Sequence, residues 1–160
     1  MTAIGLVCVR LVLAVVLFAH GAHKLFGAFA GPGIGPGGIG NAAAHFTALG
    51  LEPAYVLAVV AGLAQLLGGV LIGLGWFARW AAGANLIYMI GGIWKVHGHW
   101  GLFLNWTGDP ARGHGIEYSI VLASVLFLLV VAGAGDFSID ARRAKHVQSR
   151  ALGRARVRRT

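Results

Sequence analysis

The stretch PAYVLAVVAGLAQLLGGVLIGLGW, Pro53–Trp76, decides what kind of fold this sequence adopts. It carries no charge and only one strongly polar side chain, Gln65, and it exceeds the roughly 20 residues that a helix needs to cross a bilayer. Glu52 and Pro53 mark its beginning, because proline is favoured in the first turn of a helix. The stretch therefore predicts a transmembrane helix over residues 53–76.

Three more apolar stretches predict membrane spans over residues 4–26, 77–96 and 116–134. The turn around Arg79 is very short, so spans 53–76 and 77–96 form an antiparallel hairpin. The glycine- and proline-rich segment from Gly27 cannot stay helical in a bilayer, but Asn41 to Gly50 fits a short interfacial helix. We therefore expect an all-α fold: a four-helix transmembrane domain over residues 1–140, with this interfacial helix in its first outer loop.

Composition and charge agree with a membrane protein. Of the 160 residues, 58% are apolar and 11% are charged, with a mean hydropathy of +0.76, far from the usage of soluble domains. The net charge of +8 comes from residues 141–160, a basic tail without an acid. Such a tail after an apolar helix is typical of a topology determinant that contacts anionic lipid, so we expect no nucleic acid. Cys8 is the single cysteine, which excludes an internal disulfide, and we expect it to be a small buried hydrophobe.

Lysine and arginine counts predict the orientation. In a four-span chain the tail and Arg79 lie on one side of the membrane, and they carry more basic residues than the opposite loops. Both termini are therefore expected in the cytoplasm. The long loops 27–52 and 97–115 then lie outside it.

Polar and aromatic side chains gather at this outer end of the predicted bundle. Six of the seven histidines belong to it: His20, His23, His45, His97, His99 and His114. One explanation is a belt of interfacial residues, because tryptophan and histidine are common at membrane surfaces. The other is a ligand pocket that opens to the outside.

A metal is one hypothesis for such a pocket. His20-x-x-His23 and His114-x-x-Glu117 each place two ligand types about one helical turn apart. Lys24 follows His23 directly, however, and its ammonium would repel a cation. A positive mouth better suits an anion, a carbonyl oxygen or a quinone head group that becomes anionic on reduction. We therefore expect no metal site.

The quinone hypothesis assigns roles to particular residues. Lys24 and His97 would donate hydrogen bonds to the carbonyl oxygens, and Glu117 would exchange protons with water, which makes these three the candidate catalytic residues. The residues expected to contact the quinone are His20, Lys24, Gln65, Trp94, His97 and Asn105. The sequence has no dinucleotide-binding fingerprint, no haem-attachment motif and no cluster cysteines, so electrons would come from a partner protein or a soluble reductant.

Arg10 lies about two turns inside the first predicted helix, at a depth where a charge needs a partner. Asp136, Asp140 and Asn85 are the candidates at matching depth, and an internal ion pair that fixes helix packing is the expected role.

For several other polar and small residues, the sequence is consistent with both a structural and a functional role. Lys24 and Glu117 share an outer depth and could pair with each other. Gln65 lies in mid-membrane, where it would either link two helices by a hydrogen bond or bind a quinone carbonyl or a transported solute. The Gly69-x-x-x-Gly73 pair predicts close helix contact, with self-association as the alternative.

Several motifs in order along the chain carry a family resemblance. They are Arg10, Gly21-x-x-Lys24, Gly68-Gly69 through Gly73-Leu-Gly75, Arg79, Glu117-Tyr118, and Gly133-Ala-Gly-Asp136-Phe-Ser-Ile-Asp140. In order and spacing they resemble the DoxX family of small four-helix membrane proteins. One departure is Gln65, because the family often has a glutamate near this position, so a buried acid–base pair with Arg10 or Lys24 is not implied here.

The resemblance implies a helical bundle at the plasma membrane. Its better-understood relatives include the membrane subunit of a thiosulfate:quinone oxidoreductase and a membrane partner of secreted redox-defence enzymes. Related folds also serve as assembly chaperones and cargo adaptors without catalysis, so membership does not by itself give the function.

The leading hypothesis is a quinone-interacting, multi-pass subunit of an oxidoreductase at the plasma membrane, with the head group at the outer mouth of the bundle. The alternative is a non-catalytic membrane anchor or assembly factor whose outer loops hold a secreted or membrane partner. A small-solute transporter is a third possibility, for which four spans would require oligomers. All three imply contact with membrane lipid, and the first two imply a protein partner or a homo-oligomer.

Overall fold

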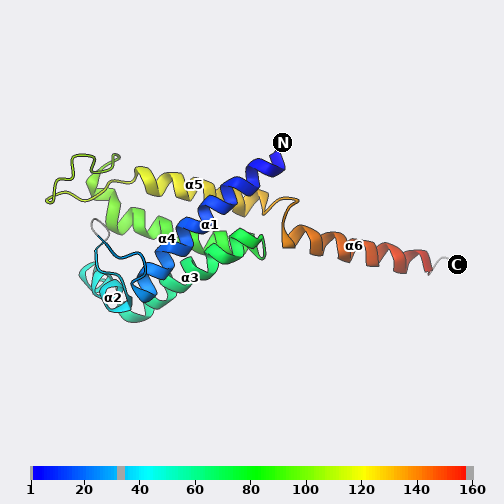
Figure 1. The fold of residues 1–160 in the computed structure, drawn as a ribbon, viewed down its shortest axis with the longest axis horizontal. Coiled ribbons are helices and arrows are strands. Elements are labelled where there is room, and N and C mark those ends of the chain that lie inside the picture. The colour runs from blue at the N-terminus through cyan, green and yellow to red at the C-terminus, as the bar shows by residue number, and fades with distance from the viewer. Residues whose placement is uncertain (1, 32–34, 158–160) are drawn as a thin grey trace.

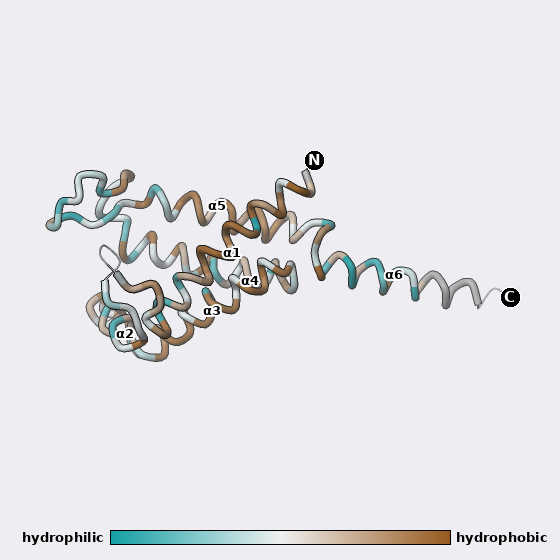
Figure 2. The backbone as a smooth tube through the Cα atoms, viewed as in Figure 1, coloured by the Kyte–Doolittle hydropathy of each residue, from teal (hydrophilic) through white to brown (hydrophobic). Residues whose placement is uncertain are grey.

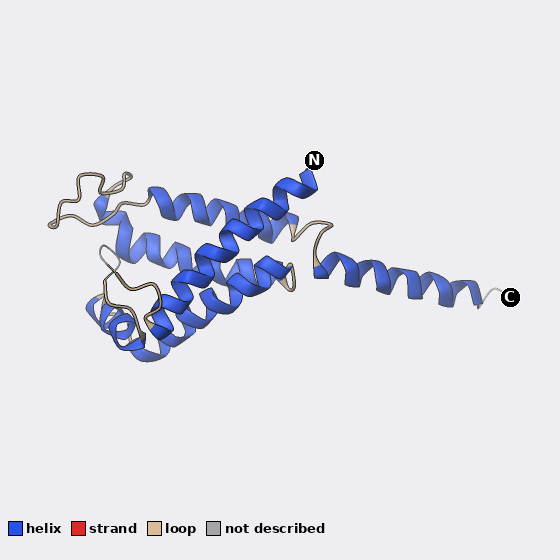
Figure 3. Ribbon diagram, in the orientation of Figure 1, coloured by secondary structure: helices blue, strands red, loops and turns tan. Residues whose placement is uncertain are grey.

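The computed structural model describes residues 2–31 and 35–157, and within these ranges it is all-helical and contains no strand (Figure 3). The helices are α1 Thr2–Phe26, α2 Ile39–Ala48, α3 Ala54–Leu74, α4 Ala78–Gly92, α5 Glu117–Ala132 and α6 Ile139–Val157. A π-helical turn, η1 Ile93–His97, and a 3-10 turn, η2 Gly98–Trp100, continue α4. The all-α fold class is therefore confirmed.

Helices α1, α3, α4 and α5 pack in a ring: α1 contacts α3, α3 contacts α4, α4 contacts α5, and α5 contacts α1. We call these four helices the bundle. Helix α2 packs against α1 and α3. Figure 1 shows the chain's N-terminus and the start of α6 at one end of the bundle, which we call the terminal end. The opposite end carries α2 and the long connection before α5, and we call it the loop end.

Glycines with positive φ end two helices earlier than the apolar pattern predicts. Helix α3 stops at Leu74 because Gly75 has a φ of 66°, and α5 stops at Ala132 because Gly133 has a φ of 79°. Glycine adopts such values without the steric cost that a Cβ would bring. The predicted span 77–96 also divides in two, since α-helix gives way to π-helix at Ile93.

The tail residues 141–160 were expected only as a basic segment, but they belong largely to α6, and α6 is fixed to the turn between α3 and α4. The two carboxylate oxygens of Asp140 accept hydrogen bonds from the amides of Phe77, at 3.0 Å, and Ala78, at 3.1 Å. The Asp140 amide donates to the Gly75 carbonyl oxygen at 2.9 Å. Asp140 therefore caps the N-terminus of α4 from a distant part of the sequence, and its charge favours that helix end.

The small residues of α3 are explained by contact with α1. A Cβ on Gly69 would lie 2.7 Å from the Ala14 carbonyl oxygen and from the Phe18 amide nitrogen. A Cβ on Gly21 would overlap the α3 backbone at Leu66. Close helix contact is thus confirmed, and because α1 covers Gly69, this glycine is not available for self-association.

Arg10 is buried, with 3% of its surface exposed, but its expected side-chain partners were wrong. Its Nη1 donates to the Ala134 carbonyl oxygen at 2.5 Å, and its Nη2 donates to those of Gly73, at 3.0 Å, and Phe137, at 3.1 Å. These carbonyls lie in the last turn of α3 and in the segment after α5, where helix geometry leaves acceptors free and the helix dipole is negative. Backbone carbonyls therefore solvate the guanidinium in place of an aspartate or asparagine.

The outside of the bundle is apolar. Among the described helices, Ala3–Phe26 of α1 and Ala54–Leu74 of α3 are long and apolar enough to cross a membrane. Large aliphatic side chains point outward, with Val12 66% exposed on α1 and Ile87 74% exposed on α4. Figure 2 shows this apolar character along the bundle, in contrast to the hydrophilic α6. Cys8 is exposed on this surface, which corrects its expected burial.

Candidate functional site

A cavity of about 650 Å³ opens at the loop end between α1, α3, α4 and α5, and we call it the main cavity. Its apolar wall consists of Val16, Leu17, Met89, Val96, Leu104 and Leu122. Its polar side chains are His20, Lys24, His45, Gln65, Tyr88, His97, His114, Tyr118 and Ser119. Apolar walls with a few convergent polar groups, at this size, are the usual makeup of a small-molecule site.

Gln65 is the deepest polar group of the main cavity. Its side chain is 3% exposed, and its Oε1 atom has no hydrogen-bond partner among the described residues. The link between helices expected of Gln65 is made by Asn85 instead, whose Nδ2 donates to the Ala64 carbonyl oxygen of α3 at 2.9 Å. A buried amide oxygen without a donor costs on the order of 1–3 kcal/mol, so a bound water or ligand that donates to Gln65 Oε1 would be stabilised there.

His97 and His114 have their tautomers fixed by the backbone. His97 Nδ1 donates to the His114 carbonyl oxygen at 2.9 Å, because a carbonyl only accepts. His114 Nδ1 accepts from the Asn105 amide at 3.1 Å, so the proton of the neutral ring sits on Nε2. The neutral His97 ring thus keeps Nε2 as an acceptor, and His114 keeps Nε2 as a donor.

A lysine and a tyrosine pair with each other in the lining of the main cavity. Lys24 Nζ lies over the Tyr88 ring, 5.4 Å from its centroid, which is a cation–π contact between α1 and α4. Lys24 and Glu117 do not form the ion pair that their matching depth predicted. Among the described residues no aspartate or glutamate lines this cavity, and Lys24 is its one charged side chain.

Three of the predicted site residues lie outside the lining of the main cavity. A carboxylate oxygen of Glu117 accepts from the amide of Leu104, a lining residue, at 3.1 Å. Asn105 uses its side chain inside the loop, where Nδ2 donates to the Asp109 and Arg112 carbonyl oxygens, both at 2.7 Å. Trp94 lines a neighbouring cavity. The structure therefore brings His20, Lys24, Gln65 and His97 together in the lining of the main cavity. Glu117 does not line the cavity but binds the lining residue Leu104.

The histidine pairs considered for a metal do not converge. His23 points away from the main cavity, and its Nδ1 donates to the Ala28 carbonyl oxygen at 3.0 Å, near the end of α1. Within residues 2–31 and 35–157, no three histidine, cysteine or acidic side chains are close enough to hold a metal ion.

Sequence reasoning did not include Tyr88 in the site. Tyr88 follows the buried Asn85 by three residues on α4, and Gly92 follows by seven, so all three share one helical face. That spacing from the most polar residue of the predicted span was the signal that could have found them.

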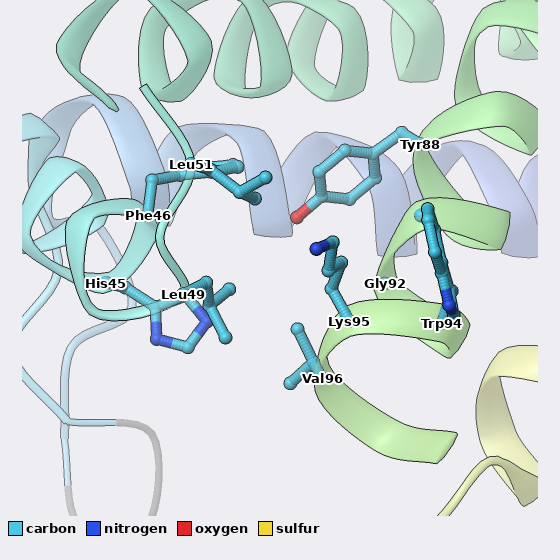
Figure 4. Close-up of a pocket in the computed structure, with 10 residues that line it drawn as sticks. His45, Phe46, Leu49, Leu51, Tyr88, Gly92, Trp94, Lys95 and Val96 are labelled. Atoms are coloured by element: carbon cyan, nitrogen blue, oxygen red, sulfur yellow. The ribbon is translucent and has the colours of Figure 1, made fainter. Parts of the chain in front are cut away.

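A second cavity of about 270 Å³, which we call the side cavity, lies between α2 and the end of α4 (Figure 4). Its lining consists of His45, Phe46, Leu49, Leu51, Tyr88, Gly91, Gly92, Trp94, Lys95 and Val96. His45, Tyr88, Gly92 and Val96 line the main cavity as well. The two cavities therefore adjoin across shared residues.

Comparison with known proteins supplies the family. A model of the DoxX family matches residues 5–98, which is more than half of the 160 residues and includes α1, α2, α3, α4 and η1. No curated protein and no solved structure matched the chain. The matched region contains the two long apolar helices, as suits a family of membrane proteins. The quoted motifs from Arg10 to Arg79 lie within the matched residues, whereas Glu117-Tyr118 and residues 133–140 lie beyond them. Because the match covers more than half of the chain, the chain belongs to the DoxX family.

Proposed function

We propose that this protein is a multi-pass protein of the plasma membrane that binds a quinone head group in its main cavity, as a subunit of an oxidoreductase. The bundle helices would span the bilayer. Their exposed faces support this, because outward aliphatic side chains such as Val12, Val60 and Ile87 would face water in a soluble protein.

The proposed orientation has both termini in the cytoplasm. Arg79, Arg142, Arg143 and Lys145 lie on or next to the helices that start at the terminal end, and basic residues favour the cytoplasmic side. The main cavity would then open toward the outer face of the membrane. Exchange of protons with the outside would be direct, through the loop that carries His114.

The observation that carries the proposal is the unpartnered amide oxygen of Gln65, in a cavity where a lysine is the only charged side chain among the described residues that line it. A quinone carbonyl would accept hydrogen bonds from the Lys24 ammonium and the Gln65 amide group. The corresponding quinol hydroxyl would donate to Oε1, so one amide serves both oxidation states. The aliphatic walls suit the ring, and no carboxylate lines the cavity to oppose negative charge on the oxygens.

Bound quinone would undergo two-electron reduction with uptake of two protons, and the electrons would come from a partner protein or a soluble reductant. His20, His45, His97 and His114 line the cavity and would carry protons, with His97 and His114 next to the outer loop, and the Glu117 carboxylate binds the amide of the lining residue Leu104. This chain would contribute binding, orientation and proton supply.

Extraction of the purified protein tests the proposal. Protein in mild detergent is extracted with solvent, and quinone is measured by chromatography for wild type, Lys24→Met and Gln65→Leu. Lys145→Met is the matched control, because Lys145 is exposed on α6. We expect near-stoichiometric quinone in wild type and control, and less than about a tenth of that amount in both cavity variants, because each variant removes a hydrogen-bonding group from the cavity. Absence of quinone from wild type, before and after incubation with added quinone, contradicts the proposal.

A membrane anchor or assembly factor is the second candidate function. The connection before α5 projects beyond the bundle (Figure 1) and exposes apolar side chains, with Phe103 62% and Trp106 76% exposed. Such a surface suits a protein partner outside the membrane. A second polypeptide that co-purifies with wild type but not with Trp106→Ala, in a preparation without quinone, would favour this function.

A further inference from the structure

The side cavity differs in chemistry from the main cavity. Phe46, Leu49 and Leu51 of the α2 region form one wall, and α4 with η1 forms the other. Figure 4 shows these apolar side chains facing the Tyr88 hydroxyl and the Lys95 ammonium. Apart from these groups and His45, the wall is almost entirely hydrocarbon.

The polar groups of the side cavity lie where it meets the main cavity or at its open edge. Tyr88 and His45 line both cavities and so mark the junction. Lys95 and Trp94 are exposed, and the Lys95 ammonium lies 5.0 Å from the centroid of the Trp94 ring. A lysine above a tryptophan is a common pair at a membrane surface, where the charge reaches polar surroundings and the stem stays in the apolar layer.

The two cavities together form a bent site with a polar part and an apolar part. An occupant of both would need a hydrogen-bonding head group next to Lys24 and Gln65, and a flexible apolar chain that passes Tyr88 and Gly92. A tail-less quinone would leave the apolar part empty. Hydrocarbon walls without partner atoms lose their dispersion contacts, so an apolar chain there gains packing even when it comes from lipid.

We infer that the side cavity holds the isoprenoid tail of the quinone whose head group occupies the main cavity. The ligand is then a lipid-soluble, tailed quinone that enters from the bilayer between α2 and α4. This inference rests on the proposed function, and it adds the class of quinone and the route by which the quinone arrives.

Gly91 gives a way to fill the side cavity alone. It lines the side cavity and not the main one, and a Cβ built on it meets no atom within 4 Å. Gly91→Phe therefore places a ring where the tail would lie, without a backbone clash. Gly40→Phe on α2 is the matched control, because Gly40 also has open space around its Cβ and lines neither cavity.

The experiment measures dissociation constants in lipid nanodiscs by quenching of tryptophan emission. The probes are a methoxylated benzoquinone and a methylnaphthoquinone, each with and without an isoprenoid tail, so that either head type is tested. Proteins are compared at one lipid content, so that partition of the tail into lipid is the same for all. We expect Gly91→Phe to raise the dissociation constant of the tailed quinone at least tenfold, which corresponds to about 1.4 kcal/mol. The dissociation constant of the tail-less quinone should stay within about twofold of the wild-type value. Gly40→Phe should change neither.

Each outcome has one meaning. Tailed quinone that binds Gly91→Phe as it binds wild type overturns the inference and leaves the proposed function in place. Equal loss of both quinones also overturns it, because the side cavity would then belong to the head-group site. If no quinone binds wild type, the proposed function itself is wrong. Should Gly91→Phe elute as aggregate, Leu49→Phe enlarges the side chain in the same cavity from the α2 side without adding a tryptophan to the readout.

Discussion

Replacement of Arg10 by leucine should destabilise the protein by about 2–5 kcal/mol. Its guanidinium binds three carbonyl oxygens from two separate segments, and hydrogen bonds with a charged donor contribute about 1.5–3 kcal/mol each, or about 4–9 kcal/mol together. The burial of the charge costs several kcal/mol, which leucine recovers, and this reduces the net effect.

Arg10→Leu should still destabilise the protein, because the three carbonyl oxygens that bind the guanidinium would be left without donors. The Phe77 amide, the usual partner of the Gly73 carbonyl in a continuing helix, binds Asp140 instead. Two controls separate charge from geometry. Arg10→Lys keeps the charge but cannot reach all three carbonyl oxygens from one nitrogen. It should therefore lower the free energy of unfolding by about half as much as Arg10→Leu. Arg142→Leu removes an exposed arginine of α6 and should stay within about 0.5 kcal/mol of wild type.

The measurement is reversible unfolding in mixed micelles by titration with an anionic detergent, followed by circular dichroism. The free energy of unfolding comes from the midpoint and slope of each titration. If Arg10→Leu unfolds at the same midpoint as Arg142→Leu, the carbonyl contacts contribute nothing beyond the cost of burying the charge, and the reasoning is refuted.

Three further predictions use the same titration. Asp140→Ala should cost about 1 kcal/mol, because it leaves the first amides of α4 uncapped, whereas Asp136→Ala at an exposed position should cost little. Asn85→Leu should cost about 1–3 kcal/mol, because it breaks two hydrogen bonds of 2.9 Å, whereas Gln65→Leu should be neutral or stabilising, because its amide oxygen has no partner to lose. Gly21→Val should abolish folding or shift α1 against α3, seen as loss of monodisperse protein, because its Cβ has no room there. A stable, monodisperse Gly21→Val would contradict the packing of these two helices.

The sequence predicted well which segments are helical, because helix formation follows periodicity and hydropathy. Helix ends were predicted less closely at Gly75 and Gly133, where a single backbone angle decides the boundary. The start of α4 was predicted within one residue, but its capping residue, Asp140, could not be predicted, since it comes from a segment far along the chain. Local sequence carries no signal for a cap supplied by a distant helix.

The partners of charged residues were the weakest predictions, for a physical reason. Matching depth put Arg10 beside acidic side chains and Lys24 beside Glu117, but depth leaves the rotation of each helix undetermined. Arg10 instead donates to backbone carbonyls at and after helix ends. Every helix has free carbonyls at its C-terminus, and the residue types there do not indicate which of them will bind a distant arginine. Asn105 was expected at a ligand, but its amide holds the polar loop that carries it, because a loop must satisfy its own backbone.

The polar groups at the two ends of the bundle differ in their surroundings, because Gln65 lines the main cavity and Arg10 does not, and this difference is why the main cavity is a better candidate for function than Arg10. At the terminal end, both Arg10 Nη atoms and both Asp140 oxygens have partners, and these hydrogen bonds stabilise the fold, although Arg10 Nε is buried without a partner among the described residues. At the loop end, Gln65 Oε1 is buried without a partner, and the Lys24 ammonium has a tyrosine ring as its recorded contact. Unused hydrogen-bonding capacity in an apolar cavity lowers stability, and it is worth keeping only where a ligand completes it. The comparison therefore predicts that bound quinone raises the unfolding midpoint of wild type and leaves that of Gln65→Leu nearly unchanged.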